Sequence, residues 1–450
     1  MAERPGLGKR PSENNGGVSP PPSKRKQQST TTSKAVASFF TPLSKKEPDK
    51  MSWRIVKDSL LVGRYTASSA KTSAANRTRI AAFDFDSTLI TSASGKVFSR
   101  DASDWKWWHI SVPATLRRLY EEGYLVAIVS NQGGISLRPD PKTVKSDQKR
   151  LADFKTKVSA VLNQLDIPLS IYAATGRDQY RKPRTGMWDE LLDDYDRDGP
   201  NAVDLGNSFF VGDAGGREAL KGGSKDHSCS DRDFAANVGL SFHTPEEYFL
   251  HEDPRPFTRN FDPTAYITKH GLVGKPTSAL PTITKPDSVE IILMCGSPGA
   301  GKSSFYWRKL QPLGYGRVNQ DILKTRDKCV KAATALIEEG TSVVVDNTNA
   351  DPDTRAVWVK LAQSFNVSIR CVLFTALARL CEHNDTVRAL NVGPEMNPED
   401  RTILPKLAFT GFASRYREPK LSEGFTEIIR TDFEFEGSEE HQKLWSRYWV

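Results

Sequence analysis

Two aspartates stand two residues apart in the segment FDFDSTL at 83–89, at the end of the apolar run Ile80–Phe85. A carboxylate at the end of a buried strand can attack phosphorus as a nucleophile and divide one difficult step into two easier ones. A second carboxylate on the same edge can protonate the leaving oxygen and then activate water. We therefore interpret Asp84 as the nucleophile and Asp86 as the acid/base of a site that removes phosphate groups.

Other polar groups that this reaction needs follow in the segments SNQ at 130–132, RKP at 181–183 and VGD at 211–213. Side chains that hold the phosphate oxygens stabilise the negative charge that develops there. The expected phosphate-binding residues are Thr88, Ser130, Asn131 and Lys182. Mg²⁺ prefers hard oxygen ligands. The expected ligands are Asp84, Asp86 through its backbone carbonyl, and Asp213.

A second phosphate-handling segment, GSPGAGKSS at 296–304, follows the apolar run Val289–Cys295. Glycines in this G-x-x-x-x-G-K-S spacing let backbone N–H groups approach phosphates, and the N-terminus of the following helix adds positive potential. We expect Lys302 to reach the β- and γ-phosphates of ATP and Ser303 to bind Mg²⁺. The expected ATP-binding residues are Gly296, Ser297, Pro298, Gly299, Ala300, Gly301, Lys302, Ser303, Ser304 and Arg388.

Two further segments address the group that accepts the phosphate. VNQD at 318–321 places Asp321 at a strand end, where it can take a proton from an attacking hydroxyl. The apolar run Val343–Val345 is followed by three polar side chains, Asp346, Asn347 and Asn349. Asp346 can either orient Ser303 and its Mg²⁺ or bind the surroundings of the triphosphate.

A helical pattern over Leu377–Leu390 carries Arg379 and Arg388. A fixed guanidinium fork suits the γ-phosphate during its transfer, so Arg388 is a candidate lid arginine. For Arg379, a surface ion pair is at least as good an explanation as a catalytic role.

Apolar runs alternate with helical patterns in both halves of the chain, which is typical of parallel, doubly wound sheets. We predict an α/β protein with two such domains, at 52–252 and 288–450, with ligands at the carboxyl ends of their strands. Residues 253–287 are crowded with Pro and Thr and lack periodicity, so they are predicted to form a linker. Residues 1–50 carry few large apolar side chains and are predicted to be a disordered tail.

Three tryptophans, Trp105, Trp107 and Trp108, stand in the insert at 94–108 between the first two predicted strands. They can stack on bases at the mouth of the cleft, or they can pack the insert against its domain. We expect both roles within the group.

The formal net charge is +8, and ten Lys or Arg against four Asp or Glu give residues 1–50 a net +6. The remainder is close to neutral, so any nucleic-acid groove must be a local feature. Basic clusters at 9–10 and 24–26 form a pattern that an importin-type receptor can read, which predicts a nuclear protein. A merely solvated basic tail is the alternative. No apolar run approaches the roughly 18 residues of a membrane span, so no membrane association is expected.

One apolar island interrupts the tail at 33–43. Val36, Phe39 and Phe40 would line one face of a short turn there, and the segment resembles a degenerate motif for docking on the replication sliding clamp, PCNA. Ser33 stands where that motif prefers Gln. A chance aromatic pair is the alternative.

The phosphatase segments resemble the haloacid-dehalogenase superfamily. From about residue 53 onward the chain also resembles the polynucleotide kinase 3′-phosphatase family, through SGKVF, SNQGG, RKPxxGMW, VGDAGGR, GSPGAGKSS, VNQD and VDNTN. This resemblance implies removal of 3′-phosphates from DNA ends, ATP-dependent phosphorylation of 5′-hydroxyls, and the roles given above for Asp84, Asp86, Asp213, Lys302, Ser303 and Asp321. A broken DNA strand is a substrate with two such ends.

The chain departs from the family pattern in two places. The animal enzymes begin with a forkhead-associated domain, and no segment here has its length or strand pattern, so recruitment by phosphothreonine scaffolds is not supported. Thr386 stands where a lid arginine is expected, so we assign the lid role to Arg388.

Three other functions were weighed. An RNA end-healing kinase/phosphatase usually adds a KxDG ligase motif and paired HxT/HxS motifs, and only a single HxS, His109–Ser111, is present. A metabolic kinase fused to a small-molecule phosphatase would not share the long family resemblance. A repair scaffold with vestigial activity would have no chemical reason to keep every expected catalytic residue.

Overall fold

A computed structural model of the chain describes residues 50–68, 77–97, 99–138, 140–195, 202–219, 225–269, 283–391 and 397–450. Met1–Asp49 form a unit separate from Lys50–Val450. The basic clusters of the tail and Val36, Phe39 and Phe40 lie outside the described residues. Within the described ranges, no helix has both the length and the apolar surface that crossing a bilayer requires.

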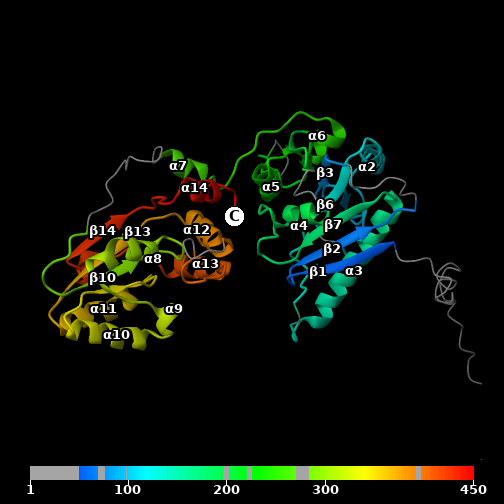
Figure 1. Cartoon of the computed structure of the whole chain (residues 1–450). Coiled ribbons are helices and arrows are strands. Elements are labelled where there is room, and N and C mark those ends of the chain that lie inside the picture. The colour runs from blue at the N-terminus through cyan, green and yellow to red at the C-terminus, as the bar shows by residue number, and fades with distance from the viewer. Residues whose placement is uncertain are drawn as a thin grey trace, which may run out of the picture. The chain divides into compact units, whose positions relative to one another are not determined.

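The first sheet has seven strands (Figure 1). Their spatial order is β1 (Met51–Val56), β2 (Leu60–Tyr65), β7 (Leu169–Ala174), β6 (Leu125–Asn131), β3 (Ile80–Phe83), β8 (Phe209–Val211) and β9 (Ser241–His243). From β7 to β9 all neighbours are parallel, so their carboxyl ends meet at one edge of the sheet. The predicted parallel arrangement is confirmed for these strands.

The sheet also has an antiparallel edge at β1 and β2, which the prediction did not include. β1 and β2 form an antiparallel hairpin, and β2 also pairs antiparallel with β7. The hairpin turns through Lys57 and Asp58, whose φ angles are 45° and 53°. Hairpin turns with positive φ angles usually contain Asn-Gly or Asp-Gly, which makes them recognisable in a sequence. Lys-Asp carries no such signal, so the sequence does not reveal the hairpin.

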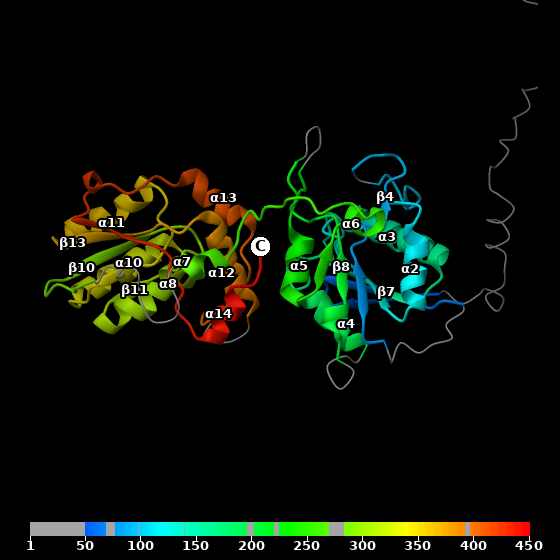
Figure 2. The ribbon, with the colours of Figure 1, turned by 90° about the horizontal axis from the view of Figure 1, so that it is seen from above.

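Helices cover both faces of the first sheet. One core packs α2 (Val112–Glu121), α3 (Val144–Leu165) and α6 (Pro245–Leu250) against it. The other core packs α4 (Gly186–Asp194) and α5 (Ser230–Val238). Figure 2 shows α2 and α5 on opposite sides of β8. Strands that are buried on both faces must be apolar along their whole length, which leaves their ends as the places for charged side chains.

The tryptophan-rich insert is anchored by a two-stranded ribbon, β4 (Ile90–Thr91) and β5 (Lys106–Trp107). Trp105, Trp107 and Trp108 are all partly buried against the core that also holds α2 and α3. Trp107 Nε1 donates a hydrogen bond to Gln164 on α3 at 3.2 Å. The packing role therefore applies to all three rings, and stacking on bases stays a prediction.

The second sheet has five strands, and all of them are parallel. Their order is β11 (Gly316–Val318), β12 (Val343–Val345), β10 (Glu290–Cys295), β13 (Ser368–Phe374) and β14 (Glu427–Thr431). α10 (Arg326–Glu338) and α11 (Pro352–Ser364) cover one face. α8 (Lys302–Phe305), α12 (Ala378–Leu390) and α13 (Lys406–Arg415) cover the other. β10 is central, so the glycine-containing loop that follows it opens in the middle of the carboxyl edge.

The predicted linker contains regular structure. A short helix, α7 (Thr264–Lys269), forms within 253–287. Phe261 and Tyr266 pack beside α12 and the C-terminal helix α14 (Glu439–Trp445) in a small apolar cluster. These residues of the predicted linker are therefore helical or packed against the neighbouring helices. A six-residue helix is too short to show a periodic pattern, which explains why the sequence conceals it.

Candidate active sites

The predicted phosphatase residues meet at the carboxyl edge of the first sheet. Asp84 follows β3 directly, Ser130 lies at the end of β6, and Asp213 stands two residues after β8. Lys182 reaches the same edge from the loop between β7 and α4. Because β3, β6 and β8 are parallel neighbours, segments far apart in the sequence deliver their polar side chains to one place.

Lys182 is the central contact of this site. Its Nζ lies 2.8 Å from Asp84 Oδ1 and 2.8 Å from Asp231 Oδ1, and it donates to the Val129 carbonyl at 2.7 Å. Burial alone would lower the pKa of Lys182, but the charges of Asp231 and Asp84 outweigh burial and raise it. Lys182 is thus a fixed positive charge beside the nucleophile.

Three acidic side chains surround this ammonium group. Oxygens of Asp84, Asp213 and Asp231 all lie within 4.8 Å of one another. Burial, followed by the charges of Asp84 and Asp231, raises the pKa of Asp213 to about 8. Burial also raises the pKa of Asp231. Three carboxylates against one ammonium leave an excess of negative charge, and an all-oxygen donor set of this kind fits Mg²⁺.

Asp86 occupies the tight turn after β3, where Ser87 has a φ of 60°. Gln132 Nε2 donates to Asp86 Oδ2 at 2.7 Å and to Ser130 Oγ at 3.1 Å. Asp86 is exposed, yet the protein atoms packed around its carboxyl group raise its pKa; the Gln132 hydrogen bond opposes this rise, and the charge of Asp84 adds to it. A carboxyl group with a raised pKa keeps its proton until a leaving oxygen needs it, which suits the predicted acid/base role.

The two other predicted phosphate-binding residues, Thr88 and Asn131, differ in their hydrogen bonds. Thr88 is fully buried, and its Oγ1 has no hydrogen-bond partner among the described residues, so a phosphate oxygen would satisfy it. Asn131 differs from the prediction. Its Nδ2 donates a hydrogen bond to the Lys182 carbonyl at 3.1 Å, and its Oδ1 accepts one from the Lys182 N–H at 2.9 Å. Asn131 therefore holds Lys182 in position.

Sequence reasoning missed Asp231. It lies in the first turn of α5, is 2% exposed, and accepts a hydrogen bond from the Ala214 N–H at 3.0 Å. A Cβ at Gly212 would meet Asp231 Oδ2 at 2.4 Å, so the glycine of VGD makes room for this carboxylate. Two signals were available: this glycine, and the segment CSDRxFAxNxG from Cys229, which resembles the family and contains Asp231. Neither of them says that this acid joins the site.

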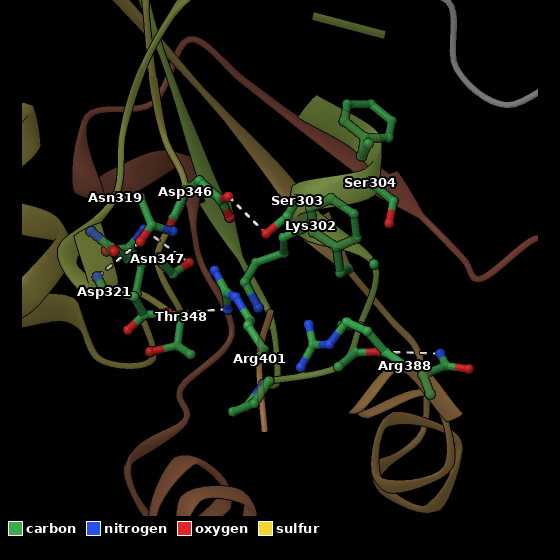
Figure 3. A pocket seen from close by; sticks show the side chains of 18 of the residues that line it. Lys302, Ser303, Ser304, Asn319, Asp321, Asp346, Asn347, Thr348, Arg388 and Arg401 are labelled. Atoms are coloured by element: carbon green, nitrogen blue, oxygen red, sulfur yellow. Dashed lines mark hydrogen bonds and ion pairs between the residues drawn. The ribbon is translucent and has the colours of Figure 1, made fainter. Parts of the chain in front are cut away.

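The predicted kinase residues surround a cavity of about 1090 Å³ at the carboxyl edge of the second sheet (Figure 3). All of them line it except Gly296 and Ser297, whose carbonyls accept hydrogen bonds from Lys302 Nζ at 2.9 and 2.7 Å. Burial lowers the pKa of Lys302. Gly299 has a φ of 74°, and a Cβ there would meet the Cys381 carbonyl at 2.1 Å, so the loop requires glycine at this point.

Two roles were left open for Asp346, namely orienting Ser303 or binding the surroundings of the triphosphate, and its contacts favour the first. Ser303 Oγ donates to Asp346 Oδ2 at 2.9 Å, which is the contact that orienting Ser303 requires. Arg317, which the sequence did not single out, donates from Nε to the same oxygen at 2.8 Å. Arg317 Nη1 also reaches Glu399 Oε1 at 2.6 Å. Asp346 is 2% exposed, so this guanidinium neutralises a buried carboxylate.

Asp321 lies slightly beyond the predicted strand end. β11 ends at Val318, and Asn319 caps the short helix α9 (Gln320–Leu323), which contains Asp321. The Asp321 N–H bonds Asn319 Oδ1 at 2.8 Å, which fixes the backbone and leaves the side chain 72% exposed. Arg401 Nη1 lies 3.0 Å from Asp321 Oδ2.

The asparagines of DNTN stabilise the surrounding loops. Asn347 Oδ1 accepts from the Gln320 N–H at 2.9 Å, which connects this segment to α9. Asn349 Nδ2 donates to the Met294 carbonyl at 2.7 Å, which connects it to β10. Both residues also line the cavity.

The two arginines of α12 are in different surroundings. Arg388 lines the cavity and pairs with the buried Asp385, and its Nε has no hydrogen-bond partner among the described residues. A phosphate oxygen would satisfy that donor. Arg379 does not line the cavity and forms a surface ion pair with Glu382 at 2.6 Å. Thr386 is buried and donates to the Glu382 carbonyl at 2.9 Å.

These observations define the class of protein. The first sheet carries the site of a haloacid-dehalogenase-type phosphatase, with its nucleophile, lysine and acids at one edge. The second carries the glycine-containing loop, lysine and serine of a P-loop kinase.

Comparison with known proteins agrees with both assignments. The family described as "Polynucleotide kinase 3 phosphatase" matches residues 79–249, and an AAA domain family matches residues 291–419. The bifunctional polynucleotide phosphatase/kinase of Schizosaccharomyces pombe is 37% identical over 402 residues, which span 89% of this chain and 88% of the relative. The chain belongs to the family of bifunctional polynucleotide phosphatase/kinases.

Two further relatives match a smaller share of this chain. The polynucleotide 3′-phosphatase of Saccharomyces cerevisiae is 30% identical over 212 residues, 37% of this chain and 86% of that protein. A polynucleotide 3′-phosphatase of Arabidopsis thaliana is 37% identical over 186 residues, 40% of this chain and 25% of that protein.

Replacing Asp231 tests the acidic cluster. Asp231→Asn removes one of the three converging carboxylates and one of the two acids that hold Lys182. We expect the Mg²⁺ concentration for half-maximal phosphatase activity to rise by about 10-fold or more, with kinase activity unchanged as the internal control. A titration that matches wild type, at full phosphatase turnover, would show that Asp231 plays no part in the site.

Proposed function

We propose that this enzyme prepares broken DNA ends for ligation by removing 3′-phosphates and by phosphorylating 5′-hydroxyls with ATP. The observation that carries the proposal is the presence of two phosphate sites with opposite chemistry in one member of this family. One site is acidic, with a nucleophile in it. The other is cationic, with a triphosphate-type loop.

In the phosphatase site, Asp84 attacks the phosphorus of a 3′-phosphomonoester and forms an aspartyl-phosphate, while Asp86 protonates the departing 3′-oxygen. Asp86 then takes a proton from the water that hydrolyses this intermediate. Lys182, Ser130 and Thr88 bind the phosphate oxygens. Mg²⁺, held by Asp84, Asp213 and the Asp86 carbonyl, would neutralise the approaching dianion, and Asp231 lies close enough to share this role.

In the kinase site, the loop at 296–304 and Lys302 hold the triphosphate of ATP, and Arg388 contacts it from α12. Ser303, oriented by Asp346, would bind the Mg²⁺ that accompanies the nucleotide. Asp321 takes the proton of the 5′-hydroxyl as that oxygen attacks the γ-phosphorus. Its exposed side chain is open to an incoming strand end.

An RNA end-healing role is the alternative, because broken RNA ends can carry the same 3′-phosphate and 5′-hydroxyl groups. Parallel assays on DNA and RNA oligonucleotides, each with a 3′-phosphate or a 5′-hydroxyl, decide between them. The DNA proposal requires the higher kcat/KM on DNA in both assays.

The two activities are expected to be separable, because their residues belong to different sheets. Asp84→Asn should abolish release of phosphate from a 3′-phosphate oligonucleotide and leave kinase activity within about threefold. Lys302→Ala should do the reverse, as measured by transfer of labelled phosphate from ATP. Loss of both activities in either folded variant would contradict independent sites.

Asp321→Asn tests the general base. Kinase turnover should fall by about 10²-fold or more, since the hydroxyl loses its proton acceptor, and ATP affinity measured by calorimetry should change little. A collapse of ATP affinity would instead assign Asp321 to the nucleotide or its metal.

We further propose, from sequence alone, that the tail at 1–50 directs the enzyme to the nucleus and docks it on the sliding clamp. The Phe39→Ala/Phe40→Ala double variant should lose capture by immobilised clamp, because these rings would be the anchors of the contact. Both activities on short oligonucleotides should stay at the wild-type level. Absence of binding by the intact protein at tens of micromolar in calorimetry would leave only nuclear import for this tail.

A further inference from the structure

A continuous series of polar contacts connects the nucleotide loop of the kinase site to the proposed base. Its members, in spatial order, are Ser303, Asp346, Arg317, Glu399, Arg401 and Asp321. Acids and arginines alternate from Asp346 to Asp321, so Arg317, Glu399 and Arg401 each have a partner of opposite sign on both sides. Arg401 occupies the last cationic position, next to the group that receives the substrate's proton.

The two contacts of Arg401 differ in strength. Its Nε lies 2.6 Å from Glu399 Oε2, and Glu399 is itself held by Arg317. Its Nη1 lies 3.0 Å from Asp321, whose side chain is 72% exposed. An ion pair with so exposed a partner is weak. The guanidinium can therefore keep its edge on Glu399 while its outer N–H groups turn to a new anion.

Arg401 also points to the place where the transferred phosphate must lie. Lys302, Arg388 and Arg401 line the same cavity, and Figure 3 shows all three side chains directed into it. The positive charges of Arg388 and Arg401 repel each other. Burial lowers the pKa of Arg388, and the charge of Arg401 lowers it further. Like charges gathered in this way are stabilised by a polyanion between them.

Arg401 fills a position that α12 leaves without an arginine. Thr386 is 4% exposed and does not line the cavity. The segment before α13 approaches α12 instead, because the buried Asp385 binds both Arg388 and, at 2.9 Å, the N–H of Leu404. The contact holds the segment that carries Arg401 against the helix that carries Arg388.

We propose that Arg401 is the second arginine of the phosphoryl-transfer step, and that it bridges the transferring γ-phosphoryl group and the Asp321 carboxylate. The proposal rests on the kinase function proposed above. In the step, the 5′-oxygen bonds to the γ-phosphorus, the bond from that phosphorus to the β,γ-bridging oxygen breaks, and ADP leaves. The hydroxyl proton passes to Asp321. Arg401 exchanges no proton, and its fork stabilises the oxygens on which charge develops.

Arg401→Gln and Arg401→Lys in the full-length protein test this. We expect Arg401→Gln to lower kinase kcat by about 10²-fold or more, within the range that a transition-state arginine supplies. ADP affinity should change by less than about threefold, and phosphatase activity of the same preparation should be unchanged. Arg401→Lys should recover less than about a tenth of the wild-type rate, because a point charge cannot replace the fork. Arg379→Gln, which removes an arginine outside the cavity, is the matched control and should behave as wild type.

A second measurement separates contact with the phosphoryl group from a structural role. Wild type should bind ADP with aluminium fluoride and a 5′-hydroxyl oligonucleotide more tightly than ADP with the oligonucleotide alone, and Arg401→Gln should lose that difference. Kinase kcat of Arg401→Gln within threefold of wild type, or equal losses of ADP binding and turnover, would overturn the proposal. If wild type itself fails to phosphorylate a 5′-hydroxyl oligonucleotide, the proposed function fails, and the role of Arg401 fails with it.

Discussion

Both sites depend on holding like charges together at the carboxyl edge of a parallel sheet. Parallel strands buried on both faces can carry charge only at their ends, so side chains of one sign accumulate there and must be compensated. In the first sheet, the acidic groups of Asp84, Asp213 and Asp231 gather beside the single ammonium of Lys182. Burial and neighbouring charges raise the pKa of Asp213 and Asp231, and a divalent cation would favour their charged forms. At the second sheet, three cations, Lys302, Arg388 and Arg401, line one cavity. The sign of the charges that gather at each edge thus separates the two chemistries.

Glycines make this crowding sterically possible. Gly212 lets the Asp231 carboxylate approach the strand that leads to Asp213, and Gly299 lets the nucleotide loop pass against the Cys381 carbonyl of α12. The second contact is reinforced by Asn384, whose Nδ2 donates to the Gly299 carbonyl at 3.1 Å. The helix that carries Arg388 is therefore fixed to the glycine-containing loop. This contact keeps the position of Arg388 relative to Lys302 constant.

The sequence reveals those parts of the sites whose residues adjoin a motif. Asp84, Asp213, Lys302 and Asp346 follow apolar runs, and their meeting at a sheet edge follows from parallel strands alone. Asp231 and Arg401 do not follow an apolar run, and Arg317 adjoins VNQD without a predicted role, because only the tertiary fold decides which distant charge pairs with a buried acid. Two local failures have local causes. The β1–β2 hairpin turns without a glycine signal, and α7 is too short for periodicity.

Residues far from any motif can take part in a site once the tertiary fold places them there. This explains how the kinase site can differ from its family pattern at Thr386 and, under our proposal, still offer two arginines to the phosphate. A guanidinium is useful in phosphoryl transfer according to where its fork lies, and any backbone position that reaches that place can supply it. Arg388 reaches it from α12 and Arg401 from the segment before α13, and Asp385 binds both segments. Because Arg401 is held by Glu399 and Arg317, it is anchored through the same network that orients Ser303. A network that fixes both the metal-binding hydroxyl and the last cation before the base ties the positions of the two reactants to each other, which is the main contribution a protein makes to phosphoryl transfer.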